Sequence, residues 1–369
     1  MAMPNIIPYK SFCWGLGTTS FRTKNFNKTI EEQLALLDEF WSLKENKGQS
    51  WSGNKELQTR YYDFMQSKGF VEGNAGNKPK DAREKTSGLV DIGLIDDRRK
   101  LSDVGKALLK ISTENDFSSD NLFQIDKDSF IYLKQLLKTY YNIDGRIVRP
   151  FLVLLHLLNK FDYLTLDEYT YLLPLCIGKN ETTEIINGIS RLRSNSTSID
   201  QIIINRLIGM SNYKTALDYF LENEVTEELV CEIGLNRKSR QYDKPYLKLY
   251  QALYKVFVLN DVDSLISVYS ATRDIKIGKW WRNYLFDTTS EKSISNHPAA
   301  HLKTTLFSEV DSETAFRVAF FKIMHLFKAK ATLSDYLDLN RRYIKTTDIV
   351  LFEDDTIKFD IVPKHFFKT

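Results

Sequence analysis

Residues 81–110 read DAREKTSGLVDIGLIDDRRKLSDVGKALLK, and this stretch decides the fold predicted for the N-terminal part of the chain. From Arg83 onward, apolar residues recur at spacings that close a helix against a core, namely Leu89, Val90, Ile92, Leu94 and Ile95. A charged turn follows at residues 96–100, Leu101 returns as a strand, and Ser102 is a suitable N-cap for a helix over 103–110. This order predicts a winged helix, although an ordinary helix and hairpin in a globular core would use the same pattern.

Positive residues gather around this unit. The segment EGNAGNKPK at residues 72–80 has the composition of a loop, and it places Lys78 and Lys80 just before the predicted helix. Residues 1–30 contain four basic residues and no Asp or Glu. A winged helix presents one helix to a DNA groove and a basic loop to the phosphates beside it. In the major groove, the planar guanidinium of Arg matches the two hydrogen-bond acceptors of guanine. We therefore expect Arg22, Lys24, Arg83 and Lys85 nearest the bases of a duplex. Phosphate contacts are assigned to Lys78, Lys80, Arg98, Arg99 and Lys100.

The overall composition is that of an ordinary globular protein. The 369 residues are 43% hydrophobic and 27% charged, and 51 basic residues against 48 acidic ones give a formal charge of only +3. No apolar run approaches the roughly 18 residues that cross a membrane, and no signal peptide precedes Lys10, so we expect a cytoplasmic protein without a membrane partner. Cys13, Cys176 and Cys231 are widely spaced and predict buried free thiols.

The sequence predicts a mainly α fold with small β hairpins, in which winged-helix or helix-turn-helix domains are joined by a helical domain. The N-terminal winged-helix DNA-recognition domain covers residues 1–112 and the helical domain covers 113–225. The third domain, 226–369, is helical and ends in a second winged-helix-like unit. The predicted helices span 28–41, 56–68, 130–141, 150–160, 166–173, 181–193, 213–223, 246–259, 311–329 and 333–340. A hairpin over 349–361 has an acidic tip at Glu353, Asp354 and Asp355, so we expect it to pack on a neighbouring domain and not on DNA.

Many metal-dependent nucleases hold a divalent ion with the sequence pattern Asp, spacer, Asp or Glu, any residue, Lys. Two places match its letters, Asp38 with Glu45 and Lys47, and Asp263 with Asp274 and Lys276. The first falls on or just after a helix, where strands are required, while residues 275–277 could alternate in a strand. His297 and His301 lie four apart without a third ligand. We assign no catalytic or metal-binding residue, and the chain is predicted to be a binder.

Several short motifs occur in the order expected for one family. They are Thr19-Ser20-Phe21-Arg22 before the helix ending at Trp41, Ala82-Arg83-Glu84-Lys85, Leu101-Ser102-Asp103-Val104-Gly105, Arg149-Pro150-Phe151 and Tyr171-Leu172-Leu173-Pro174. Through them the chain resembles the N-terminal, DNA-recognising part of the AlwI-type restriction endonucleases, a group of Type IIS and nicking enzymes.

The resemblance implies a helical, winged-helix recognition half and a C-terminal nuclease half of the PD-(D/E)XK type that uses Mg²⁺. In that pattern the nuclease half would begin where this chain stops, at Thr369. The expected function is sequence-specific recognition of a short asymmetric site in double-stranded DNA. No cofactor is expected in this chain, Mg²⁺ is expected for an associated nuclease domain or subunit, and whether this polypeptide is itself an enzyme is left open.

Two other functions remain open at this point. A winged-helix transcription regulator would share the fold and would usually dimerise to recognise a palindrome. A complete Mg²⁺-dependent nuclease would use Asp263, Asp274 and Lys276 as a PD-(D/E)XK core within this chain.

Overall fold

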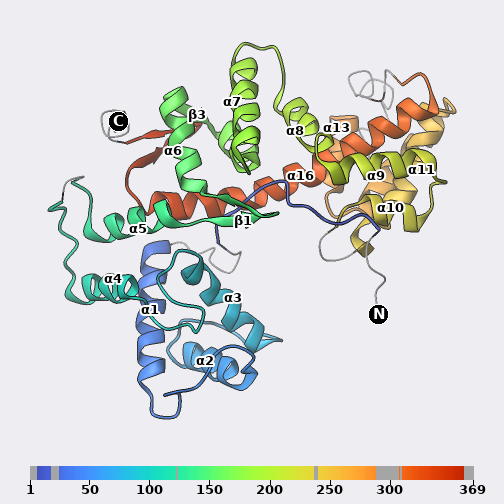
Figure 1. The fold of residues 1–369 in the computed structure, drawn as a ribbon. Coiled ribbons are helices and arrows are strands. Elements are labelled where there is room, and N and C mark those ends of the chain that lie inside the picture. The colour runs from blue at the N-terminus through green and yellow to red at the C-terminus, as the bar shows by residue number, and fades with distance from the viewer. Residues whose placement is uncertain are drawn as a thin grey trace. The chain divides into compact units, whose positions relative to one another are not determined.

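The computed structural model describes residues 6–17, 25–121, 124–236, 240–287, 307 and 310–360. These residues form a mainly helical structure with two small antiparallel sheets, which confirms the predicted mixture of helices and hairpins (Figure 1). Within the described ranges, no helix has the length and hydropathy needed to cross a bilayer.

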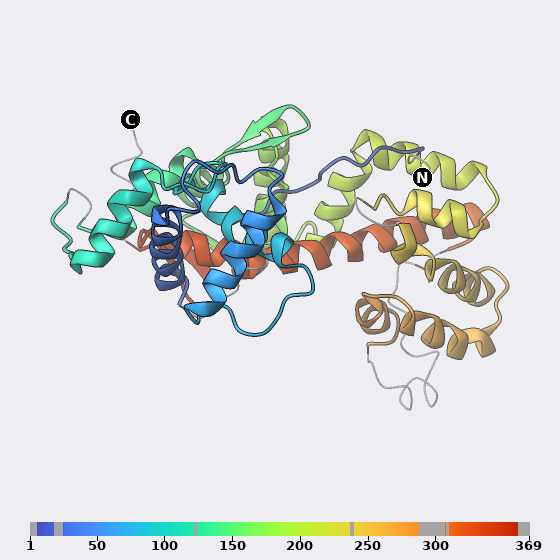
Figure 2. The ribbon, with the colours of Figure 1, turned by 90° about the horizontal axis from the view of Figure 1, so that it is seen from below.

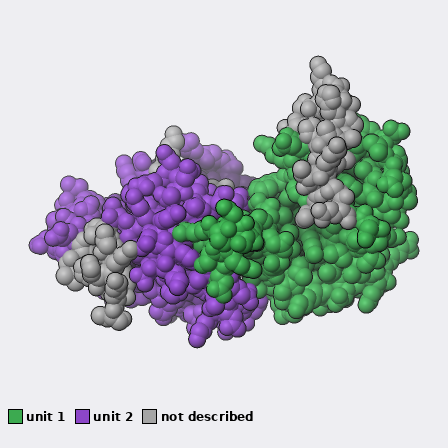
Figure 3. Space-filling view, turned by 90° about the horizontal axis from the view of Figure 1, so that it is seen from above, with its two compact units in different colours: residues 1–12, 187–333 green, residues 13–186, 334–369 purple. Residues whose placement is uncertain are grey.

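The chain divides into two compact units, each built from separate stretches of sequence (Figure 3). Unit 1 contains residues 1–12 and 187–333, and unit 2 contains residues 13–186 and 334–369. The division falls within two helices, α7 (Lys179–Arg193) and α16 (Glu313–Lys345). The three domains predicted at 1–112, 113–225 and 226–369 use other boundaries and stay a prediction.

Four helices open unit 2, and polar side chains cap three of them. The helices are α1 (Phe26–Ser42), α2 (Lys55–Ser67), α3 (Lys78–Asp91) and α4 (Asp103–Glu114). Asn54 caps α2, Asn77 caps α3, and Ser102 caps α4 by accepting from the Gly105 amide at 3.1 Å. The predicted helices over 28–41 and 56–68 and the predicted cap at Ser102 are confirmed.

The boundaries of α3 differ from the prediction at both ends. The helix begins at Lys78, so Lys78 and Lys80 lie in its first turn and not in the preceding loop. Asn77 accepts from the Lys80 amide at 3.1 Å and Pro79 has the backbone angle that a first turn needs, which explains the early start. The helix ends at Asp91 because Gly93 takes a positive φ of 72°, so Leu94 and Ile95 are not helical.

The middle of unit 2 combines helices with a small hairpin. Helix α5 (Lys127–Lys138) is followed by β1 (Tyr141–Ile143) and β2 (Arg146–Val148), which pair across Asp144 and Gly145. The prediction that the helix continued to residue 141 is therefore wrong, because an Asp-Gly pair with positive φ at both residues makes a two-residue hairpin turn. The next elements are α6 (Pro150–Phe161), β3 (Tyr163–Thr165), the π-helical turn η2 (Glu168–Leu172) and the 3₁₀ turn η3 (Leu173–Leu175).

The C-terminal part contains one long helix where two were predicted. Helix α16 runs unbroken from Glu313 to Lys345, because the joining residues 329–332, AKAT, contain neither Gly nor Pro. The predicted hairpin is confirmed as β4 (Val350–Phe352) and β5 (Thr356–Phe359), with the acidic residues in its turn. Strand β5 also pairs with β3, so the hairpin packs on the α6–β3 segment of unit 2.

Unit 1 is helical in its described part and has an aromatic core. Its elements are α8 (Ile199–Ile208), α9 (Ser211–Glu222), α10 (Glu227–Ile233), η4 (Arg240–Asp243), α11 (Tyr246–Phe257), η5 (Val262–Ser264), α12 (Leu265–Arg273) and α13 (Gly278–Phe286). The fully buried Trp281 packs against Tyr246, Phe320 and Phe327. The predicted spans do not include α8, α10, α12 and α13, each of which has ten residues or fewer.

Candidate nucleic-acid interface

Helix α3 presents a charged face to solvent. Ala82, Thr86 and Leu89 are completely buried, and this spacing fixes which side of the helix faces the core. The exposed residues are Lys80, Arg83, Glu84 and Asp91. Because consecutive helical residues are rotated by about 100°, Lys85 lies on a different side from Arg83, and it is half-buried. The two predicted base contacts on α3 therefore do not share one face.

A chain of hydrogen bonds holds Arg83 in place. Its Nη1 donates to Oε1 of Gln58 at 2.6 Å, and the Gln58 Nε2 donates to the carbonyl oxygen of Trp51 at 2.8 Å. The Gln58 side chain comes from α2 and is almost fully buried. Arg83 is thus an exposed cation whose position is set by a buried amide, which lowers the entropy that it would lose on binding.

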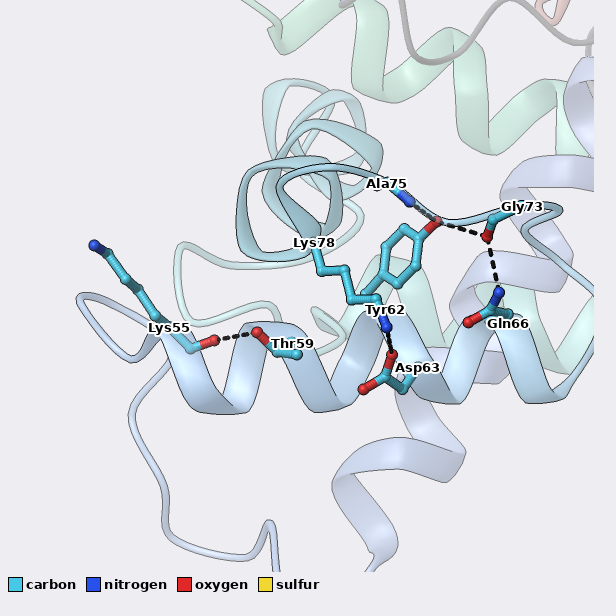
Figure 4. Close-up of polar contacts among 8 residues, drawn as sticks. All are labelled: Lys55, Thr59, Tyr62, Asp63, Gln66, Gly73, Ala75 and Lys78. Carbon is cyan, nitrogen blue, oxygen red and sulfur yellow. Dashed lines mark hydrogen bonds and ion pairs between the residues drawn. The ribbon is translucent and has the colours of Figure 1, made fainter.

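The segment before α3 is tied to α2, as Figure 4 shows. The Tyr62 hydroxyl donates to the Gly73 carbonyl oxygen at 3.2 Å and accepts from the Ala75 amide at 3.0 Å. The Gln66 Nε2 donates to the same Gly73 oxygen at 2.8 Å, and the Lys78 ammonium lies 2.7 Å from the Asp63 carboxylate. The predicted phosphate contact Lys78 is therefore already engaged in an ion pair with α2.

A tight turn at residues 96–100, which we call the wing turn, connects α3 to α4. A single antiparallel bridge between Ile95 and Leu101 closes it, so the strand predicted at Leu101 is one residue long. The Asp96 carboxylate accepts from the amides of Arg98 and Lys100, each at 2.9 Å. Arg99 has a positive φ of 63°. These contacts give the turn a defined shape without a long ladder.

Arg99 points back into the protein, in contrast to its neighbours in the wing turn. Its Nε donates to Oγ1 of Thr86 at 2.9 Å, and its guanidinium lies over the Trp51 ring at 5.8 Å. Its carbonyl oxygen accepts from Nε1 of Trp41 at 2.7 Å. Burial lowers the pKa of this guanidinium, opposed by the charges of Asp97, Asp91 and Asp96. Arg99 therefore braces the wing turn against α1 and α3.

Arg98 and Lys100 remain exposed, and in the described part of the chain neither has an ion-pair partner. Lys100 lies over the Trp41 ring at 5.3 Å, and Lys80 lies 3.5 Å from Glu84. Arg22 and Lys24 lie outside the described residues. The structure thus brings Lys80, Arg83, Arg98 and Lys100 to the exposed surface of α3 and the wing turn.

The residues that hold Arg83, Arg99 and Lys100 in place, which are Trp41, Trp51, Gln58 and Thr86, were not predicted from the sequence. Three of them lie on other segments, and Thr86 is one turn from Arg83 on the buried side of α3. No local pattern marks such partners, because each is defined by a contact between elements.

Neither of the two sequence matches to the nuclease metal-site pattern, Asp38 with Glu45 and Lys47 or Asp263 with Asp274 and Lys276, lies on strands. Asp274 is the C-cap residue after α12, and residues 274–277 form a turn, so the possible strand over 275–277 is not formed. Ile275 is buried in the connection between α12 and α13. The Asp274 carboxylate lies 3.3 Å from the Lys248 ammonium. Asp38 is exposed on α1, and His297 and His301 lie outside the described residues. Within the described ranges, no group of three His, Cys, Asp or Glu side chains is placed to hold a metal ion. All three cysteines are buried and none is part of a disulfide, as predicted.

A protein-family model described as AlwI restriction endonuclease matches residues 90–369, well over half of the chain. The chain belongs to the AlwI restriction endonuclease family. Membership of this family implies DNA binding and confirms the resemblance inferred from the short motifs. The match begins at the last turn of α3 and includes the wing turn, whereas α1, α2 and most of α3 precede it. No curated protein and no solved structure matches the chain.

Proposed function

We propose that this AlwI-family chain is a sequence-specific recognition module for double-stranded DNA in a Type IIS-like restriction or nicking endonuclease, and that it recognises a short asymmetric site. The main support for this proposal is the order of elements, because α1, α2 and α3 followed by the wing turn have the order found in a winged helix. In this proposal α3 enters the major groove and the wing turn lies along the adjacent backbone.

The charge on α3 supports base recognition. Arg83 and Glu84 are neighbours on the exposed face, and together they offer donors for guanine and acceptors for the amino group of cytosine. A face used only for phosphates would carry cations alone. We keep Arg22 and Lys24 as proposed base contacts ahead of α1, and Lys85 as a contact at the side of the helix.

Phosphate contacts are proposed for Lys80, Arg98 and Lys100, which are exposed beside Arg83. Lys78 would contact a phosphate while it remains paired with Asp63. Arg99 would support phosphate binding mainly by fixing the shape of the wing turn. We propose that hydrolysis, with the Mg²⁺ that it uses, belongs to a nuclease domain or subunit distinct from the described residues, since Asp274 is paired with Lys248 and neither nuclease-like pattern lies on strands.

Selection of bound duplexes from a random pool tests the proposed function. We expect enrichment of one short asymmetric sequence, with protection of its backbone in a footprint. Enrichment of a palindrome would instead indicate a dimeric regulator. If no sequence is enriched over the starting pool, the proposal is wrong.

Lys100→Ala is expected to weaken binding to all duplexes alike and to lower the salt slope of log K by about one, because one phosphate contact is lost. Binding titrations over a series of salt concentrations measure this slope. The matched control is Lys160→Ala, since Lys160 is an exposed lysine near the end of α6. An unchanged slope for Lys100→Ala, or an equal change in the control, would contradict the assignment.

A further inference from the structure

A second surface feature of unit 2 lies away from α3. It is a groove of about 530 Å³ between β2, α6 and the start of α7, a size typical of ligand sites. Its apolar lining includes Ile147, Val148, Leu152, Val153, Cys176 and Ile186. Ile147 and Leu152 are among the exposed large hydrophobic residues of the described chain, at 67% and 39%. Apolar side chains gathered in this way mark interaction sites more often than single exposed ones do.

The charge around the groove has one sign. The basic residues of its lining are Arg149, His156 and Lys179, and no Asp or Glu is among the lining residues. The nearby Glu181 is bound by Arg146, with Nη1 and Oε1 at 2.5 Å. Among the described residues, neither Arg149 nor Lys179 has an ion-pair partner. An apolar floor with unpaired cations at its edges is complementary to a ligand with apolar residues and flanking carboxylates.

The position of the groove separates it from the proposed DNA surface. Figure 1 shows α6 on the opposite side of α16 from α1, α2 and α3. In Figure 2, seen from below, α1 and α2 lie in front of the C-terminal part of α16. A duplex held by α3 and the wing turn would therefore leave the α6 wall of the groove open. This separation, with the apolar floor, favours a protein as the occupant over a nucleic acid.

We propose that this groove binds an amphipathic helix of a partner protein. Apolar side chains at spacings of three and four residues fill the floor along Ile147, Leu152 and Val153, and Asp or Glu residues beside them pair with Arg149 and Lys179. Recognition of an acidic amphipathic helix would attach a second protein without occupying the α3 surface. The proposal does not depend on whether α3 binds DNA.

A displayed library of random peptides, several helical turns long and selected on the whole chain, tests this site. We expect enrichment of peptides that combine a helical apolar stripe with acidic residues. For a synthetic copy of an enriched peptide, Leu152→Glu should weaken binding by about tenfold or more, since an apolar contact is replaced by a charge of the wrong sign. Lys179→Glu should weaken it severalfold, and raising the salt concentration should reduce that difference.

Three variants separate loss of the site from loss of the fold. Val262→Glu adds the same charge at an exposed apolar residue of η5, and Lys160→Glu reverses a charge on α6 outside the groove lining, so neither should affect the peptide. Thr183→Arg fills the groove from an exposed position of α7 and should weaken binding as Leu152→Glu does.

Two results would overturn the proposal. One is enrichment of peptides whose binding survives both Leu152→Glu and Thr183→Arg. The other is a duplex whose affinity falls when Arg149 and Lys179 are reversed, which would make this a nucleic-acid surface. Duplex selection with Leu152→Glu should still yield the wild-type site, so failure here is distinguishable from failure of the proposed DNA recognition.

Discussion

Arg83→Ala is expected to lower the affinity of the chain for its selected duplex by about 1–3 kcal/mol and to relax the preference at one base pair, while binding to unrelated duplexes changes little. The size of the effect follows from two features of this side chain. Its guanidinium is exposed on α3, where it can approach a base edge, and its hydrogen bond to the buried Gln58 amide sets its orientation. The Arg83→Ala substitution removes a bidentate donor whose conformational entropy is already reduced before it binds DNA.

Titration of the variant with the selected duplex, and with duplexes changed at each base pair in turn, measures this effect. Arg83→Lys is the matched control, since it keeps the charge but not the fork, and it should restore binding to unrelated duplexes without restoring the base preference. Gln58→Met keeps the size of the buried side chain and removes its acceptor, so it should lose part of the same preference. If Arg83→Ala keeps both the affinity and the base preference of the wild type, α3 does not contact bases through this residue.

Gly105→Ala is expected to destabilise the packing of α4 against the segment before the wing turn by about 1–3 kcal/mol, near the upper end of that range. A Cβ atom at Gly105 would lie 2.0 Å from the carbonyl oxygen of Leu94, and backbone cannot move aside as a side chain can. The same carbonyl oxygen accepts from the amide and the hydroxyl of Ser102, each at 3.0 Å. Helix α4 would have to move away from the base of the wing turn, so DNA affinity should fall as well.

Thermal unfolding of the whole chain and amide exchange over residues 94–105 measure this loss. Alanine has a higher helix propensity than glycine by about 1 kcal/mol, so a decrease in stability isolates the steric effect. Gly76→Ala is the control, because no atom lies within 4 Å of a Cβ there and no left-handed φ restricts it, and it should change stability by less than about 0.5 kcal/mol. Stability and exchange equal to those of the wild type would show that α4 does not approach Leu94 this closely.

Local chemistry made much of the fold predictable. The cap at Ser102, the α1 and α2 spans, the C-terminal hairpin and the family all follow from short patterns whose causes lie within a few residues. The errors have local causes too. Helix α16 is one helix and not the two predicted, because the joining residues 329–332 contain no helix breaker, and the Asp-Gly pair predicted as a break is the turn of the β1–β2 hairpin.

The candidate site was less predictable, because its geometry depends on contacts between segments distant in sequence. Three adjacent basic residues of the wing turn look alike in the sequence. Only Arg99 turns inward, because Thr86 and Trp51 offer it a hydroxyl and a ring. Likewise, Lys78 and Lys80 are two residues apart, and Lys78 is bound to Asp63 because α2 packs beside the start of α3.

The amino-acid sequence by itself determined most of the helical elements, the cap at Ser102, the basic turn after α3 and membership of the AlwI restriction endonuclease family. Only the tertiary structure decided which cations stay exposed, which are held by neighbours, and that an apolar groove forms between β2, α6 and the start of α7. The physical reason is that helix formation and capping act over a few residues. Burial and ion pairing depend on which distant side chains the packed helices bring within a few ångströms.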